Sequence, residues 1–181
     1  PVSPMFRWAY NDTVKPLPFD PTAAARILGT EGWKDTNGDG ILEKNGKRFS
    51  FVLKLPTGNA VWAAVANVVQ QRLRDIKIEM RIEQVERSVF WPDLINKKYD
   101  AWIAGFEVPL EIKLDDYWAS DLEKFQFNVV SYRNRSVDRL LDRIREAPDA
   151  SASAADIKRL QAILLQDQPC TFLFWERGRI G

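Results

Sequence analysis

The chain has 181 residues, of which 45% are hydrophobic and 28% are charged, and its formal net charge is +1. A chain of this length buries roughly 70% of the surface of its unfolded form, so it can build a core without disulfide bonds or metal ions. Its 26 basic and 25 acidic residues nearly balance, which argues against nucleic acid as a partner, because phosphate binding relies on a concentrated basic face.

The residue types exclude several kinds of catalytic site. The chain has no histidine, and its one cysteine is Cys170. Histidine-dependent triads, two-histidine zinc sites and internal disulfide bonds are therefore excluded. Cys170 lies in the apolar run CTFLFW, which predicts a buried packing role. Asp115 and Asp116 are adjacent, so their carboxylates point apart on any regular element and do not form an acid–base pair. We predict that the protein is not an enzyme and needs no cofactor.

The first helix is predicted from its cap. Residues 1–20 carry four prolines and predict an extended connector that cannot be helical. Asp20 can then cap a helix with Pro21 at its first position, and Gly29 or Gly32 can end that helix.

Residues 35–47, DTNGDGILEKNGK, are rich in turn formers on both sides of a short strand at 41–42. Asn45-Gly46 predicts a type I′ hairpin turn that leads into a strand over 48–55. The same segment resembles the start of an EF-hand loop, with liganding residues at positions one, three and five: Asp35, Asn37 and Asp39. Position twelve is Gly46 instead of glutamate, and Glu43 stands at position nine. Because Asp and Asn also stabilise tight turns by themselves, a structural turn is the favoured interpretation and weak calcium binding is the alternative.

Hydrophobic periodicity predicts the elements of the middle of the chain. Residues 59–76 form a helix with apolar residues at three- and four-residue spacing: Val61, Trp62, Val65, Val68, Val69, Leu73 and Ile76. Ile78, Met80 and Ile82 alternate with charged residues and predict a strand with one solvated face. Ser88 can cap a short helix that runs to about Lys97, and AWIAGF (101–106) predicts a buried strand.

The last third begins with an irregular, aromatic stretch over 107–134. Ser136 can cap a helix whose apolar stripe is Val137, Leu140, Leu141 and Ile144. A final helix over 153–167 has Ile157, Leu160 and Leu164 facing inward, and CTFLFW (170–175) predicts a last strand. Because strands alternate with helices, we predict an α/β fold with a sheet flanked by helices.

Five segments, taken in order, resemble segments of family 5 solute-binding proteins, the peptide- and nickel-type binding proteins of ABC importers. They are FDPTAAARILGTEGWKDTNGDGILEKNGK (19–47), IEMRIEQVE (78–86), YDAWIAGF (99–106), FNVVSYRNRSVDRLLDRIRE (127–146) and QAILLQDQPCTFLFW (161–175). The resemblance covers nearly the whole chain. It implies a lobe of the type II periplasmic-binding-protein fold, with a mixed sheet flanked by helices.

The resemblance also implies a function. Residues 21–181 would be the single C-terminal lobe of a two-lobed clamp, and residues 1–20 the connector from the N-terminal lobe of the same protein. The clamp would bind a peptide or other small solute in the interlobe cleft and deliver it to an ABC permease in the membrane. The location would be periplasmic or otherwise extracytoplasmic, although the chain itself carries no signal sequence. An independent cation-binding module or a small enzyme is the alternative.

The loop after residues 101–106 is the expected ligand site, because the equivalent loop faces the cleft in the family. In peptide-binding members an aspartate there pairs with the amino terminus of the ligand. Here Phe106 replaces the usual tryptophan, and Glu107, Glu111 or Asp115 could take the place of the aspartate, so recognition of an amine stays open. Tyr117, Trp118 and Asn128 suit the cleft wall. The alternative for Phe106 and Trp118 is a role as core aromatics.

Overall fold

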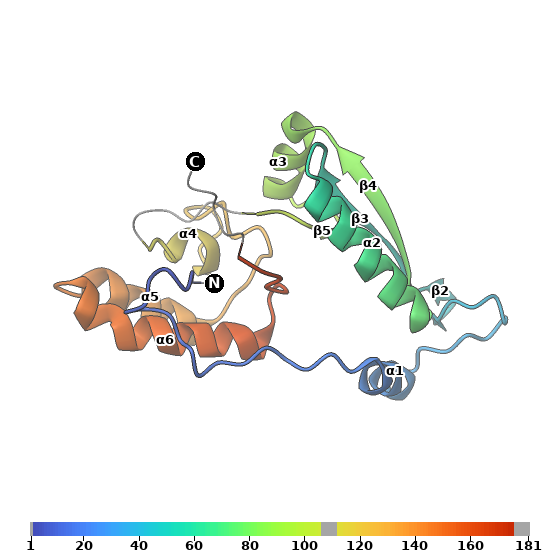
Figure 1. The fold of residues 1–181 in the computed structure, drawn as a ribbon, viewed down its shortest axis with the longest axis horizontal. Coiled ribbons are helices and arrows are strands. Elements are labelled where there is room, and N and C mark those ends of the chain that lie inside the picture. Colours follow the sequence, from blue (N-terminus) through green and yellow to red (C-terminus); the bar gives the residue numbers. More distant parts are fainter. Residues whose placement is uncertain (1, 106–111, 176–181) are drawn as a thin grey trace. The chain divides into compact units, whose positions relative to one another are not determined.

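The computed structural model describes residues 2–105 and 112–175. The chain divides into two compact units: a central unit, residues 18–106, and a terminal unit, residues 1–17 together with 107–181. The described helices are α1 (Pro21–Thr30), α2 (Ala60–Asp75), α3 (Arg87–Ile95), α4 (Asp115–Trp118), α5 (Arg135–Glu146) and α6 (Ala150–Asp167), and the strands are β1 (Glu43–Lys44), β2 (Lys47–Arg48), β3 (Ser50–Pro56), β4 (Glu79–Val85) and β5 (Ala101–Trp102) (Figure 1). None of the described helices has both the length and the apolar character needed to cross a membrane.

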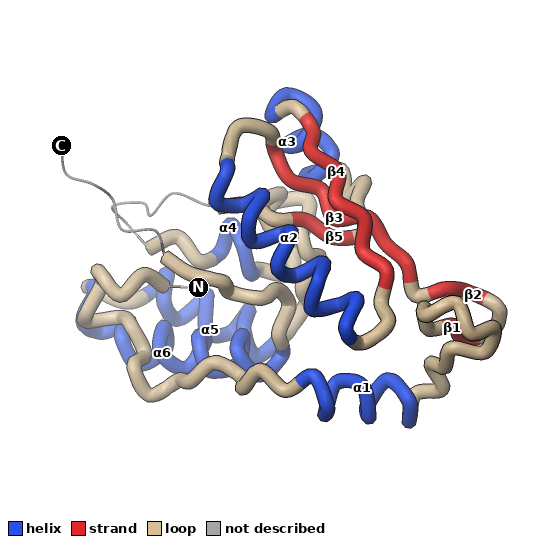
Figure 2. Tube along the Cα trace, turned by 45° about the vertical axis from the view of Figure 1, so that its right-hand side comes forward, coloured by secondary structure: helices blue, strands red, loops and turns tan. Residues whose placement is uncertain are grey.

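The core of the central unit is a parallel sheet in the order β4-β3-β5 (Figure 2). Parallel strands need a crossover connection, and α2 provides it between β3 and β4 and packs against both. The side chains of Leu53, Leu55 and Met80 are buried there with Ala66 of α2 and with Ile103. The predicted α/β class is confirmed.

Helix α2 is confirmed with almost the predicted bounds. The Asn59 side chain caps it by accepting a hydrogen bond from the Trp62 N–H at 3.0 Å. Val61 and Val68 are 54% and 59% exposed, so the prediction that both belong to the packed apolar stripe is wrong. Only one side of the helix meets the sheet, so the residues that pack there form a narrower band: Trp62, Ala63, Val65, Ala66, Val69 and Leu73.

The predicted type I′ hairpin turn is present, with φ of 53° at Asn45 and 73° at Gly46. It joins β1 to β2, so the short strand lies at 43–44 and not at 41–42. The strand predicted over 48–55 is divided, because β2 pairs with β1 whereas β3 pairs with β4 and β5. The antiparallel and parallel pairings that we expected in one mixed sheet therefore lie in two separate sheets.

The caps of two helices test the sequence prediction further. Asp20 caps α1 as expected, because its Oδ1 accepts a hydrogen bond from the Ala23 N–H at 2.8 Å. The prediction that Ser88 caps α3 is wrong, because the helix begins at Arg87 and the Glu86 carbonyl accepts its first backbone bonds. The strand predicted over 101–106 ends at Trp102, although the Ile103 N–H still donates to the Lys54 carbonyl at 3.0 Å.

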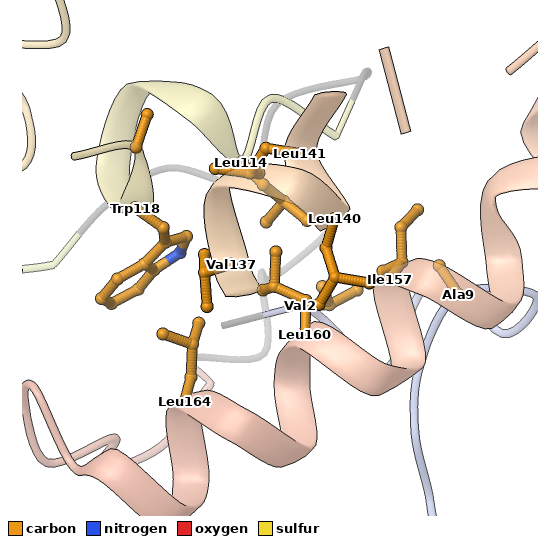
Figure 3. Close-up of a cluster of buried hydrophobic side chains, with 11 residues drawn as sticks. Val2, Ala9, Leu114, Trp118, Val137, Leu140, Leu141, Ile157, Leu160 and Leu164 are labelled. Carbon is orange, nitrogen blue, oxygen red and sulfur yellow. The ribbon is translucent and has the colours of Figure 1, made fainter. Parts of the chain in front are cut away.

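The terminal unit is built on the helical hairpin of α5 and α6. One face of each helix meets the other, and short α4 adds Trp118 to the same cluster (Figure 3). Six of the seven predicted inward residues of these helices are confirmed as buried: Val137, Leu140, Leu141, Ile157, Leu160 and Leu164. The seventh, Ile144, is only partly buried and packs against the same cluster. Burial of such apolar side chains supplies most of the stability of a helix pair.

The N-terminal segment belongs to this core. Residues 2–17 contain no helix or strand, as expected of a proline-rich connector. Val2 and Ala9 are nevertheless 4% and 0% exposed, and the Gln161 side-chain amide donates to the Ala9 carbonyl at 2.8 Å. The segment is thus an integral part of the terminal unit. That residues 1–20 connect to another lobe, and that 21–181 form one lobe, stay predictions.

Two further predictions for this unit are wrong. Asn134, not Ser136, caps α5, because its Oδ1 accepts from the Ser136 and Val137 N–H groups at 2.8 and 3.4 Å. Residues 170–175 form no strand, since the described part of the terminal unit holds no strand with which they could pair. Cys170 is half-buried beside the helical core, and burial raises the pKa of its thiol to about 11, which agrees with a packing role.

Candidate functional site

The predicted ligand site falls on the irregular segment that contains α4. Phe106, Glu107 and Glu111 lie outside the described residues. Asp115 and Asp116 open α4, as expected of carboxylates at a helix N-terminus. Four of the seven predicted residues can therefore be placed: Asp115, Tyr117, Trp118 and Asn128.

Asn128 organises the loop after α4 from within. Its side chain is 1% exposed. Its Nδ2 donates to the Ala119 and Tyr132 carbonyls, both at 2.8 Å, and its Oδ1 accepts from the Tyr132 N–H at 3.0 Å. One side chain thus closes the loop between Ala119 and Tyr132 by bonding three buried or partly buried backbone groups.

Trp118 is 7% exposed and belongs to the core of the terminal unit. Its ring meets those of Tyr132 and Phe172 at centroid distances of 6.2 and 5.9 Å, both in edge-to-face geometry. Such pairs stabilise a core beyond the area that they bury. The position agrees with the core-aromatic alternative.

Tyr117 packs at the edge of this core and is only partly buried. It is half-buried, and its ring lies 6.1 Å from that of Phe127, which is 48% exposed. Burial, followed by the charge of Asp116, raises the pKa of the Tyr117 phenol. The phenol is therefore neutral at physiological pH, so the pair offers apolar area together with a hydrogen-bonding hydroxyl.

The Asp115 carboxylate is already engaged in an ion pair. The Arg145 guanidinium of α5 contacts it and also bonds the Asp142 carboxylate at 3.1 Å. The hydrogen bond to Asp115 is the main cause of the raised pKa of Arg145. A ligand amine at Asp115 would have to compete with this guanidinium.

An open pocket of about 400 Å³ adjoins this ion pair. It lies between residues 119–125 and α5, and its lining is Ala119, Ser120, Asp121, Lys124, Phe125, Asp138, Leu141, Asp142 and Arg145. Asp138 also fixes the pocket wall, because its Oδ1 accepts from the Ser120 N–H at 2.9 Å. None of the four placed residues lines the pocket, although Asp115 contacts it through Arg145. The spacing of Asp138, Asp142 and Arg145 on one helix face was the available sequence signal.

The second candidate site is the turn after α1. The predicted turn chemistry is confirmed, because the Asp35 carboxylate accepts from the Gly38 and Gly40 N–H groups at 2.9 and 3.2 Å. The Lys77 ammonium bonds the same carboxylate at 2.8 Å and is the main cause of the lowered pKa of Asp35. One carboxylate oxygen each of Asp35, Asp39 and Glu43 lie within 4.8 Å of one another. Asn37, the third predicted ligand, is engaged with Asp39 instead.

Comparison with known proteins adds a family. Residues 1–108 match the model described as bacterial extracellular solute-binding proteins, family 5 middle. The chain is 34% identical over 185 residues to the oligopeptide-binding protein AppA of Bacillus subtilis. This alignment covers 100% of the chain and 34% of AppA. The chain is also 33% identical over 159 residues to Protein XP55 of Streptomyces lividans. This second alignment covers 86% of the chain and 29% of XP55. The chain thus spans about a third of the length of these relatives.

Solved structures agree with the sequence comparison. The structure of AppA of Bacillus subtilis in complex with a nonapeptide superposes with a TM-score of 0.81 and 32% identity. The superposition covers 90% of the present chain and 33% of the AppA chain. The structure of NikZ of Campylobacter jejuni in complex with Ni(L-His) superposes with a TM-score of 0.77 and 23% identity. This superposition covers 90% of the present chain and 33% of the NikZ chain. The second likeness concerns the fold alone. The predicted periplasmic-binding-protein type of fold is confirmed.

Proposed function

Because this chain belongs to family 5 of the bacterial extracellular solute-binding proteins, we propose that it takes part in capturing a peptide or another small solute for an ABC importer. The observation that carries the proposal is the likeness to an oligopeptide-binding protein, in sequence over the whole chain and in fold. Solute capture requires no chemical step, so the proposal includes no catalysis.

The binding mode that we propose is a clamp. The chain supplies one lobe, and a second lobe of the same protein supplies the opposite wall of the cleft. The match to only about a third of each relative supports this division. A ligand that touches both walls favours the closed state, because it makes more contacts there than in the open state. The loaded clamp then delivers the solute to a permease on the extracytoplasmic side of the membrane.

On this lobe, we assign ligand contact to the accessible side of the segment around α4. The Tyr117–Phe127 pair offers apolar aromatic area, which suits a site that must hold varied side chains. Asp115 and the acidic residues before it are the partners for a ligand amine, in competition with Arg145. Trp118 and Asn128 are buried, so we assign them a supporting role in which their contacts with Tyr132 hold this segment in place.

Calorimetry with a defined oligopeptide mixture tests the proposal. We expect the protein at the full length of its relatives to bind peptide, and the 181-residue chain alone to bind at least about 100-fold more weakly, because it lacks the contacts of the opposite wall. Tyr117→Ala in the longer protein should weaken binding, whereas Tyr99→Ala, a tyrosine of the central unit, serves as the matched control. Tight binding by the chain alone would overturn the shared cleft, and a longer protein that ignores peptides would overturn peptide as the solute.

A further inference from the structure

The three carboxylates of the turn after α1 converge at the distance that a single ion requires. One oxygen each of Asp35, Asp39 and Glu43 lie within 4.8 Å of one another. Calcium binds oxygen ligands at about 2.3–2.6 Å, so two oxygens on one ion are at most about 5 Å apart. These separations are therefore compatible with one ion held by all three residues.

Glu43 makes this cluster different from an ordinary acidic turn. Its side chain is 9% exposed. Its Oε2 accepts hydrogen bonds from the Thr36 N–H at 2.9 Å and from the Thr36 hydroxyl at 3.0 Å. Its Oε1 is buried and has no hydrogen-bond partner among the described residues. A buried carboxylate oxygen without a donor is costly, and two more carboxylates beside it raise that cost by repulsion.

The two basic side chains nearby do not supply a hydrogen-bond donor to Glu43 Oε1. The Lys77 ammonium bonds Asp35 Oδ2 at 2.8 Å, and the Arg48 guanidinium bonds Asp39 Oδ2 at 2.5 Å. Their own side chains are 53% and 46% exposed, so water screens both ion pairs. Neither bonds Glu43 Oε1. A cation bound by the three carboxylates would supply a partner for the Glu43 carboxylate, whose Oε1 these two groups leave without a donor.

We propose that the turn over residues 35–43 binds a calcium ion through the carboxylates of Asp35, Asp39 and Glu43. The ligands are all oxygen atoms, which excludes the sulfur and nitrogen ligands that zinc favours. The cluster is irregular, which the flexible coordination of calcium tolerates and the strict octahedral geometry of magnesium does not.

The site is built differently from an EF-hand. Glu43, the ninth residue from Asp35, is the first residue of β1, so the hairpin rather than a second helix presents it. The Leu42 N–H also donates to the Lys77 carbonyl at 2.9 Å, at the turn between α2 and β4. A bound ion would therefore hold the hairpin against the end of the parallel sheet. This role is structural, so it is independent of solute capture.

Thermal melting of the full chain in calcium and in chelator tests the proposal. Extracellular modules bind calcium with Kd of about 10⁻⁴–10⁻³ M, so roughly 10 mM calcium should raise the melting midpoint by about 3–10 °C. Terbium provides a direct readout, because Trp33, two residues before Asp35, can sensitise its luminescence. Calcium should then displace the terbium. Magnesium at the same concentration should do neither.

Glu43→Gln is the decisive variant. Glutamine keeps an oxygen for Thr36 and places an amide donor toward the other carboxylates, so the variant should melt in chelator at or above the midpoint of the unsubstituted protein. The calcium shift should be lost in this variant and kept in Glu31→Gln, which removes one exposed carboxylate at the end of α1. No calcium shift in the unsubstituted protein, an equal shift in Glu43→Gln, or an equal effect of magnesium would each overturn the proposal.

Discussion

Asn128 is a buried polar side chain whose hydrogen bonds all serve the backbone of one loop. Asn128→Ala leaves the Tyr132 N–H and two carbonyls without their partner. We expect the free energy of unfolding to fall by about 1–3 kcal/mol, because buried backbone groups lose their bonds. Denaturant unfolding measures the change.

The matched control for this substitution is Asn96→Ala. Asn96 is exposed and donates one side-chain bond, to the Pro92 carbonyl at 2.7 Å. We expect its loss to change stability by less than about 0.5 kcal/mol. Equal stabilities of the two variants would contradict the organising role of Asn128.

Gly105 shows how a residue without a side chain can be required by packing. A Cβ at this position would lie 2.7 Å from Cζ2 of Trp62, the large aromatic residue of α2. Gly105→Ala should therefore lower the free energy of unfolding by about 1–3 kcal/mol through overpacking.

The matched control is Gly29→Ala. This change adds a methyl group inside α1, where nothing lies within 4 Å, and should raise the free energy of unfolding by about 0.5–1 kcal/mol. Opposite signs in thermal melting are the expected result, and a stable Gly105→Ala protein would refute the close approach.

At the scale of elements, the residue that caps α5 differs between the structure, where it is Asn134, and the sequence prediction, where it is Ser136. Asn134 accepts hydrogen bonds from two N–H groups of the first turn, whereas the Ser136 hydroxyl accepts one from Arg139 at 3.0 Å. Asn134→Ala should lower the free energy of unfolding by about 0.5–2 kcal/mol, and Ser136→Ala should change it by less than about 0.5 kcal/mol. The reverse order in chemical denaturation would restore Ser136 as the cap.

The same comparison explains which elements could be predicted. Helices α2 and α6 are long enough for a periodic apolar stripe, and Asp20, the α1 cap, stands directly before a proline at the first helical position. The strand in CTFLFW was predicted wrongly, because an apolar run indicates a strand only where another strand is available for pairing. Serine at 88 and at 136 was misassigned as a cap because a good cap residue within the first turn obscures the boundary by one or two positions.

The candidate sites were predictable to different degrees for a similar reason. The turn chemistry of residues 35–40 follows from local spacing, so the sequence predicted it correctly. The contribution of Glu43 depends on its burial at the start of β1, and the ion pair of Asp115 depends on Arg145, which lies 30 residues further along the chain. Interactions over such separations are set by tertiary packing, and periodicity carries no information about them.

At the scale of the whole molecule, the family resemblance predicted the fold type, and the local patterns did not predict the division into two units. The central unit is continuous in sequence, whereas the terminal unit draws on residues 1–17 and 107–181. The prolines of residues 1–20 predict a connector, but no local pattern indicates that this segment packs with α6. Only contacts between distant segments, such as Val2 and Ala9 with α6, reveal which residues share a core.

The bond between Ala9 and Gln161 has a consequence for the order of events during synthesis. These partners are separated by 152 residues. At ribosomal rates of about 5–20 residues per second, roughly 8–30 s pass between the emergence of the first partner and that of the second. The central unit, complete by residue 106, can acquire its structure in this interval. Val2 and Ala9 therefore stay without their core partners on α6 until that helix has been made.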